Sequence, residues 1–131
     1  MMRAVRRRGT RPELAVQELV RALGFHYRLN NKSLPGSPDL SNKRGGWVIF
    51  VHGCFWHGHR HCKKTKGGRD GRVPASRAAF WADKLATNRA RDRRNARQLR
   101  AMGFRVLTVW ECELRDLDGT RGRLARFLRQ R

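Results

Sequence analysis

Residues 47–62 read WVIFVHGCFWHGHRHC and place a strand-like run directly before a cluster of cysteines, histidines and aromatic residues. The run 47–51 is apolar and rich in β-branched residues, which is typical of a buried strand, and Gly53 lets the chain turn straight after it. Two cysteines and three histidines then fall between Cys54 and Cys62. Such close spacing of metal-ligating side chains favours a metal site in this loop.

A structural zinc site is the expected use of this loop, because zinc binds four sulfur or nitrogen ligands in a tetrahedron. Three cysteines are present, and one histidine would complete the set. Spacing alone does not choose among His57, His59 and His61, and it matches none of the common zinc-finger spacings. The alternative is three buried cysteines beside a histidine-rich loop without metal. The motifs of the zinc deaminases and of the H-E-x-x-H metalloproteases are absent, which argues against a catalytic zinc of either type.

Charge is the main constraint that composition places on function. The chain has 131 residues, enough for a single domain, and 31 Lys and Arg against 10 Asp and Glu give a net charge of +21. Such an excess favours a polyanionic partner, nucleic acid above all. The alternative is a solvated basic surface in a protein from a high-GC genome, which prefers Arg to Lys. The start MMRAVRRRG has no apolar core, and no apolar run approaches the roughly 20 residues of a membrane span. We therefore expect a soluble, intracellular protein.

The first half of the chain predicts a helix followed by a hairpin. Thr10 and Glu13 have the spacing of a capping box, and Gly24 ends the helix that they begin. The apolar stripe of this helix consists of Val16, Leu19, Val20 and Leu23. Residues 25–29 form a possible short strand, and 38–52 are predicted to form two strand pieces joined by a hairpin, with Asp39 near one end.

The second half predicts a long helix, a strand and a short helix. The long helix covers residues 77–102 and ends at Gly103, with Leu99 and Met102 facing inward. It is expected to break or bend near Thr87 and Asn88. Its arginine-rich part, 89–100, is expected to be solvated or to face phosphates. Residues 104–110 read as a strand and 124–128 as part of a basic amphipathic helix. The order αβββαβα indicates an α/β or α+β sheet domain with helices on its faces.

Several motifs together resemble the very short patch repair (Vsr) endonucleases, bacterial enzymes that act on T:G mismatches. They are MRAV with TRPEL, SLPGSPDL, VIFVHGCFWHGH, FWADK, NRARD and FRVLTVWEC, in the family's order over nearly the whole chain. The resemblance implies a restriction-endonuclease-like fold of the PD-(D/E)xK superfamily, a mixed β-sheet flanked by helices with a structural zinc site. It also implies that residues ahead of MRAV contribute to DNA binding in the family, so we expect weaker DNA binding by this chain.

The resemblance further implies the roles of particular residues. Asp39 and the backbone carbonyl of Val51 would bind magnesium, and His57 would transfer a proton. The residues expected to hold metal-bound water and phosphate are His52, Glu13 and Asp92. The structural zinc would be bound by Cys54, His59, Cys62 and Cys112, with His61 as the alternative to His59. The residues expected to intercalate into DNA are Phe55 and Trp56, supported by Trp81.

Simpler roles remain open for some of these residues. Glu13 would then only cap its helix, Asp39 would be a turn residue, and Asp92 would pair with neighbouring arginines. Phe55 and Trp56 would belong to the core.

The chain is therefore interpreted as a single-domain DNA mismatch endonuclease that uses Mg²⁺, in a two-metal arrangement, and one structural Zn²⁺. It would nick one strand of duplex DNA next to a T:G mismatch that arises from 5-methylcytosine deamination. The expected setting is a monomer at the bacterial nucleoid, without membrane contact and able to contact mismatch-repair proteins. The alternatives are a restriction-modification-associated nicking enzyme of broader mismatch range and a zinc-stabilised DNA-binding module that does not cut.

Overall fold

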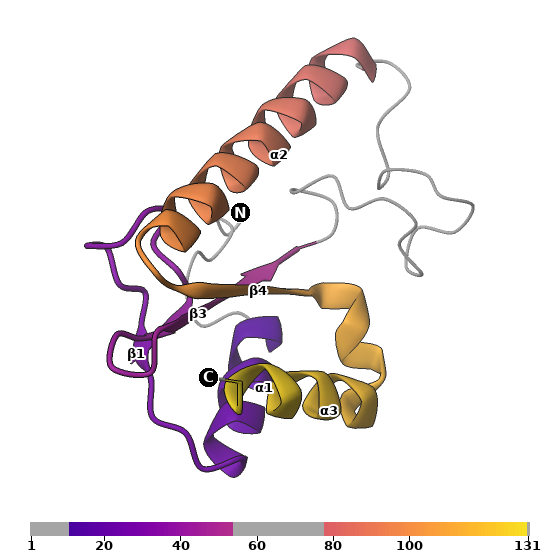
Figure 1. The fold of residues 1–131 in the computed structure, drawn as a ribbon. Helices are drawn as coiled ribbons and strands as arrows, with labels where there is room; N and C mark the ends of the chain where they lie inside the picture. Colours follow the sequence, from indigo (N-terminus) through magenta and orange to yellow (C-terminus); the bar gives the residue numbers. More distant parts are fainter. Residues whose placement is uncertain (1–10, 54–77, 131) are drawn as a thin grey trace.

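The computed structural model describes residues 11–53 and 78–130, and Figure 1 shows their arrangement. The helices and strands follow the predicted order, with one additional 3-10 helix, η2, after the last strand. Their bounds are α1 (Arg11–Ala22), β1 (Arg28–Leu29), β2 (Leu40–Asn42), β3 (Trp47–His52), α2 (Ala78–Ala101), β4 (Arg105–Trp110), η2 (Glu111–Arg115) and α3 (Leu117–Leu128).

The four described strands form one mixed sheet in the order β1-β2-β3-β4. The predicted hairpin is confirmed: β2 and β3 are antiparallel, and Leu40 pairs with Ile49. β4 lies parallel to β3 in a register that pairs Phe50 with Thr108. A parallel pair needs a long crossover, and α2 belongs to the segment that provides it. β1 covers only the last two residues of the short strand expected at 25–29.

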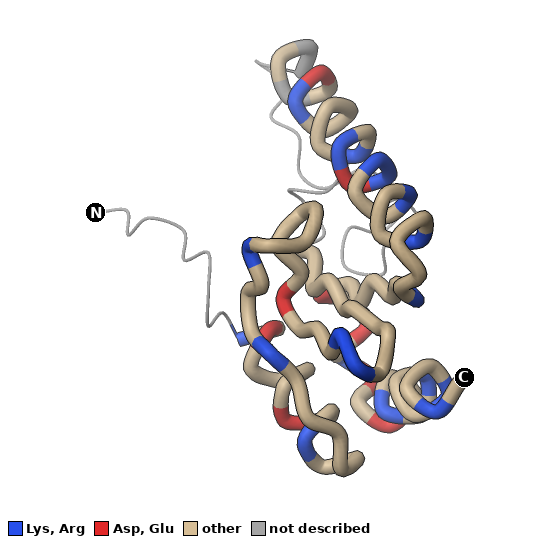
Figure 2. The backbone as a smooth tube through the Cα atoms, turned by 60° about the vertical axis from the view of Figure 1, so that its left-hand side comes forward, with Lys and Arg blue, Asp and Glu red and all other residues tan. Residues whose placement is uncertain are grey.

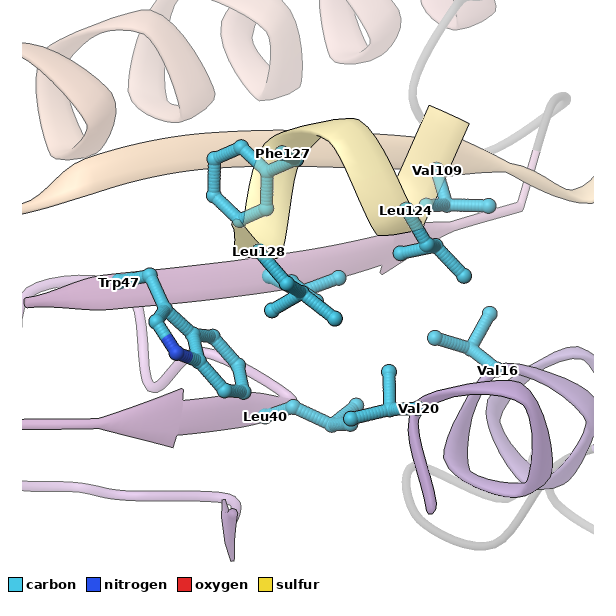
Figure 3. Packing of buried hydrophobic residues seen from close by; sticks show 9 residues of the cluster. Val16, Val20, Leu40, Trp47, Val109, Leu124, Phe127 and Leu128 are labelled. Atoms are coloured by element: carbon cyan, nitrogen blue, oxygen red, sulfur yellow. The ribbon is translucent and has the colours of Figure 1, made fainter. Parts of the chain in front are cut away.

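Helices cover both faces of the sheet, α2 on one and α1 with α3 on the other (Figure 1). Successive residues of a strand point to opposite faces, so β3 contributes to two hydrophobic clusters. Trp47 and Ile49 pack toward α1 and α3, as Figure 3 shows for Trp47, whereas Val48 and Phe50 pack with Leu99 of α2. The near-continuous burial of β3 follows from this two-sided cover.

α2 is one continuous helix that runs straight in Figure 1, so the break or bend predicted near Thr87 and Asn88 is wrong. Neither residue is glycine or proline, and the helix continues through both positions. Leu99 is fully buried as expected, but Met102 is 55% exposed. Met102 lies just past the end of α2, in the turn that Gly103 completes with φ +98°, and there it no longer shares the inward face of the helix.

The helix α1 and the helix α3 were both predicted, and they pack against each other. Val16 and Val20 of α1 are fully buried and meet Leu124 and Leu128 of α3 in the larger cluster (Figure 3). The side chain of Asp116 caps α3 by accepting a hydrogen bond from the N–H of Gly119 at 3.0 Å. Within the described ranges no helix is long and apolar enough to cross a membrane.

Candidate functional site

Asp39 and Val51 lie side by side where the β2–β3 hairpin ends. Asp39 directly precedes β2, and its Oδ2 accepts a hydrogen bond from the backbone N–H of Val51 at 2.6 Å. In an extended strand the N–H and C=O of one residue point to the same side, so the Val51 carbonyl points toward the edge on which Asp39 lies. The fold thus brings a carboxylate and a backbone carbonyl together at one end of the hairpin.

His52, the next residue of β3, is oriented by packing and by a carboxylate. Its side chain is nearly buried, and its ring lies 5.6 Å from the ring of Phe50 and 5.2 Å from that of Trp110, in an edge-to-face arrangement with Trp110. Its Nδ1 is 3.9 Å from Oδ2 of Asp92 on α2. These contacts from its own strand, the neighbouring strand β4 and the facing helix α2 limit the orientations that the imidazole can adopt.

These groups face a cavity of about 560 Å³ between α2, the end of the hairpin and the start of α1. The cavity is lined by Glu13, Gly36, Ser37, Asp39, Phe50, Val51, His52, Arg91, Asp92, Asn95, Ala96 and Thr108. Glu13 enters it from the first turn of α1 and is only 7% exposed. The structure therefore brings together five residues that the sequence analysis singled out: Glu13, Asp39, Val51, His52 and Asp92.

Pairing with an arginine for Asp92 and helix capping for Glu13 account for only part of what the structure shows of these two acids. Asp92 is near both an arginine and His52, because Arg91 Nη2 is 3.8 Å from Asp92 Oδ1. Pairing with a neighbouring arginine and facing the cavity are therefore compatible for Asp92. The buried carboxylate of Glu13 lines the same cavity, which a helix cap alone does not require.

Asn95 and Thr108 line the cavity and were not singled out from the sequence, and Arg91 was included only in the arginine-rich stretch 89–100 that was expected to be solvated or to face phosphates. Arg91 and Asn95 are neighbours of Asp92 on α2, and the helical spacing of three residues between Asp92 and Asn95 was an available signal. Thr108 faces the cavity from β4, opposite Phe50. The parallel pairing that puts Thr108 there is not visible in the sequence.

The oxygen atoms at the hairpin end suit magnesium better than a softer metal. Mg²⁺ usually keeps several waters and is bound by one or two carboxylates together with substrate phosphates. Asp39 and the Val51 carbonyl meet that need, and the cavity leaves room for waters and a phosphate. Among the residues that the structure describes, no three His, Cys, Asp or Glu side chains are grouped closely enough to form a metal cluster by themselves.

The predicted zinc site and the DNA-intercalating residues fall mostly outside the described residues. Cys112 is buried in η2, with Trp110 packed against it. Its expected partners and their neighbours lie outside the described ranges: Cys54, Phe55, Trp56, His57, His59, His61 and Cys62. Trp81 belongs to α2, but its side chain is not described. The zinc ligands and the intercalating aromatics stay predictions.

A mixed sheet flanked by helices, with acids and a histidine around a cavity, defines an α/β domain with a candidate catalytic site. The catalytic domain of the homing endonuclease I-Bth0305I has this fold, with a TM-score of 0.59 over 91% of this chain and 94% of that one. At 20% identity, that likeness concerns the fold alone.

Sequence relatives identify the family. The model of DNA mismatch endonuclease Vsr matches residues 1–64. The type II nicking enzyme V.XorIIP of Xanthomonas oryzae pv. oryzae is 46% identical over 98% of this chain and 89% of its own length. The DNA mismatch endonuclease Vsr of Escherichia coli K12 is 45% identical over 89% of this chain and 70% of its own length. The chain belongs to the Vsr family of DNA mismatch endonucleases, and the resemblance found in the sequence is confirmed.

Proposed function

We propose that this protein nicks one strand of duplex DNA beside a mismatch, with T:G as the preferred mispair. The observation that carries the proposal is the cavity that gathers Asp39, the Val51 carbonyl, His52 and Asp92 in a chain of the Vsr family. The high positive charge of the chain suits a polyanionic substrate. Relatives named as DNA mismatch endonuclease and as nicking enzymes support the same reaction class.

The fold is proposed to be a divergent form of the PD-(D/E)xK nucleases. In that superfamily the strand after the Pro-Asp carries an acid and a lysine. Here the corresponding strand is β3, which carries Phe50, Val51 and His52 after Pro38 and Asp39. The hydrogen bond between Asp39 and Val51 supports this correspondence, because it places the acid beside that strand.

Nicking requires one bond to form and one to break at phosphorus. A water oxygen adds to phosphorus, the bond from phosphorus to one sugar oxygen breaks, the water loses a proton and the leaving oxygen gains one. Asp39 and the Val51 carbonyl would hold Mg²⁺, which supplies relief of negative charge on the phosphate when it is bound. His52, Glu13 and Asp92 would orient water and phosphate, and His57 is the residue predicted to move the proton.

A nicking assay on duplexes with Mg²⁺ tests the proposed activity directly. Asp39→Ala should lower the nicking rate on the order of 100-fold or more, since it removes a predicted metal ligand, while DNA binding persists. Asp83→Ala is the matched control, because Asp83 is an exposed carboxylate on α2 outside the cavity. Equal rates for wild type and Asp39→Ala would overturn the mechanism.

The mispair preference needs a panel of substrates. Duplexes that carry each mismatch, labelled on either strand, should be cut fastest at T:G and on one strand only. Because several relatives are named type II nicking enzymes, a broader mismatch range is the second candidate, and comparable rates on other mispairs would favour it. Binding without any cut, with Mg²⁺ present, would favour a DNA-binding module.

The proposed zinc site has its own measurement. Protein purified without chelator should contain one zinc per chain by atomic emission, and Cys112→Ser should lower that content because it removes a thiolate ligand. The buried position of Cys112 beside Trp110 supports a structural rather than a catalytic role. Absence of zinc from the wild-type protein would contradict the four-ligand site.

A further inference from the structure

Acidic side chains outnumber basic ones around the cavity, which disfavours a bound phosphate unless a cation is present. Three of its lining residues are carboxylic acids, Glu13, Asp39 and Asp92, and Arg91 is the one Lys or Arg among its described lining residues. A DNA phosphate that enters brings a further negative charge, and like charges at short range oppose binding. Mg²⁺ at Asp39 would offset part of this charge. Arg91 is the protein's own cation at the same place.

Arg91 lines the cavity and its side chain remains accessible. Neighbouring residues of a helix point in different directions, so Arg91 and Asp92 would not meet if both extended straight from α2. Their side chains nevertheless approach to 3.8 Å, and Arg91 is 49% exposed. The guanidinium therefore lies at the rim, close to Asp92 and open to a large ligand.

Other arginines of α2 do not share this placement. Figure 2 shows Lys and Arg positions along α2, and four of the arginines near Arg91 do not line the cavity. These are Arg93, Arg94, Arg97 and Arg100. Arg91 is thus distinguished by position and not by charge alone.

We propose that Arg91 is the phosphate-binding residue of the cavity and contacts the phosphodiester that is cut or the one next to it. This inference rests on the proposed nicking function. A guanidinium presents five N–H donors in a planar fork that fits two phosphate oxygens at once, which a lysine does not reproduce. Asp92 keeps the guanidinium at the rim when no DNA is bound, and the phosphate takes over this pairing when DNA enters.

A purely structural role makes a different prediction. If Arg91 only balanced the charge of Asp92, its loss would disturb His52 through Asp92 and would slow nicking without depending on the charge of the substrate. A substrate with a neutral linkage separates the two roles. A methylphosphonate replaces one phosphate oxygen by a methyl group and removes the negative charge at a single chosen position.

The first measurement compares Arg91→Ala with Arg94→Ala for binding to a mismatched duplex in buffer without divalent metal. Both variants lose one arginine from the same helix, so helix propensity and net charge are matched. Arg91→Ala should weaken binding by about 10- to 100-fold and reduce the salt slope by about 1, because one charge-assisted phosphate contact is lost. Arg94→Ala should change the affinity several-fold less. Equal losses in the two variants would overturn the proposal.

The second measurement repeats the comparison with a methylphosphonate scanned across the phosphates beside the mismatch. At one position the neutral linkage should weaken wild-type binding, and there Arg91→Ala should cause no further loss. If the loss from Arg91→Ala stays the same at every position, the phosphate contact is wrong. Because both measurements are made without turnover, they test Arg91 even if the wild type fails to nick, an outcome that would count against the proposed function alone.

Discussion

Gly36 lies where the segment that carries Asp39 meets α2. Its φ is +78°, a left-handed conformation that favours glycine, and a Cβ at this position would come within 2.9 Å of Nδ2 of Asn95. Asn95 therefore packs directly on the backbone of this segment. The close approach fixes the distance between α2, which carries Asp92, and the turn that presents Asp39.

Gly36→Ala should lower the free energy of unfolding for two reasons, the left-handed backbone at this position and the crowding of the added Cβ against Asn95. Gly24 provides the matched control, because its φ is +89° and a Cβ added there would meet nothing within 4 Å. A left-handed alanine costs about 1–2 kcal/mol at either position, and crowding against Asn95 should add roughly 1–3 kcal/mol at Gly36. Urea unfolding of the two variants measures the difference. Equal losses of unfolding free energy in the two variants would show that α2 or the Asn95 side chain moves aside at little cost.

Among individual residues, the acids that line the cavity could be predicted from the sequence, whereas other polar residues beside them could not. Asp39 follows a proline in a turn and Asp92 lies in the family motif NRARD, so both were visible. Arg91 belongs to the same motif, but the sequence does not separate it from the other arginines of the stretch 89–100, whereas its place in the cavity lining and its approach to Asp92 do. Thr108 carries no sequence signal, because its role depends on which strand pairs with β3.

At the element scale, Arg105 connects three parts of the molecule. It begins β4, its backbone N–H donates to the Gly46 carbonyl at 2.8 Å, and its guanidinium donates to the carbonyls of Phe127 and Gly45. The guanidinium carbon also lies 5.1 Å from the ring centre of Phe127. One side chain thus joins the hairpin turn, the edge of the sheet and the end of α3.

Arg105→Ala should lower the free energy of unfolding by about 1–3 kcal/mol, since two carbonyls lose a charged donor and Phe127 loses a stacking partner. Arg97→Ala, on α2 and outside these contacts, should stay within about 0.5 kcal/mol of wild type. Denaturant titration of both variants gives the two values. Indistinguishable unfolding midpoints would mean that α3 is held by its apolar face alone.

The C-terminal ends of the two helices that are followed by a glycine were predicted correctly. Gly24 and Gly103 have positive φ and end α1 and α2 as the sequence indicated. The interruption expected in α2 rested on the modest helix propensity of Thr87 and Asn88. That expectation was wrong, because modest propensity does not interrupt the hydrogen bonds within a long helix. Strand order was not predictable, because the pairing of β3 with β4 joins residues far apart in the chain.

At the scale of the whole molecule, the charge of +21 has opposite effects on stability and on DNA binding. Mutual repulsion of the cations destabilises the folded chain and salt screens it, whereas salt also weakens contacts with phosphates. Raising NaCl from about 50 to 200 mM should therefore raise the thermal midpoint while it lowers DNA affinity by an order of magnitude or more.

Differential scanning fluorimetry and fluorescence anisotropy measure these two responses on one protein sample. Sucrose is the control, because it stabilises the fold through exclusion from the surface and should leave the affinity for DNA nearly unchanged. A thermal midpoint that falls with NaCl would show that specific ion pairs outweigh the general repulsion.

The packing of α1 on α3 joins two segments that lie far apart in the chain. Glu13 is on α1, and the helix is held by a cluster to which Leu124 and Leu128 contribute. During synthesis α1 leaves the ribosome before the sheet and α3 do. Its apolar stripe is covered only when those later elements have formed, so the fold depends on contacts between distant parts of the chain. We therefore expect Glu13 to take its place in the cavity during synthesis only after α3 has docked on α1.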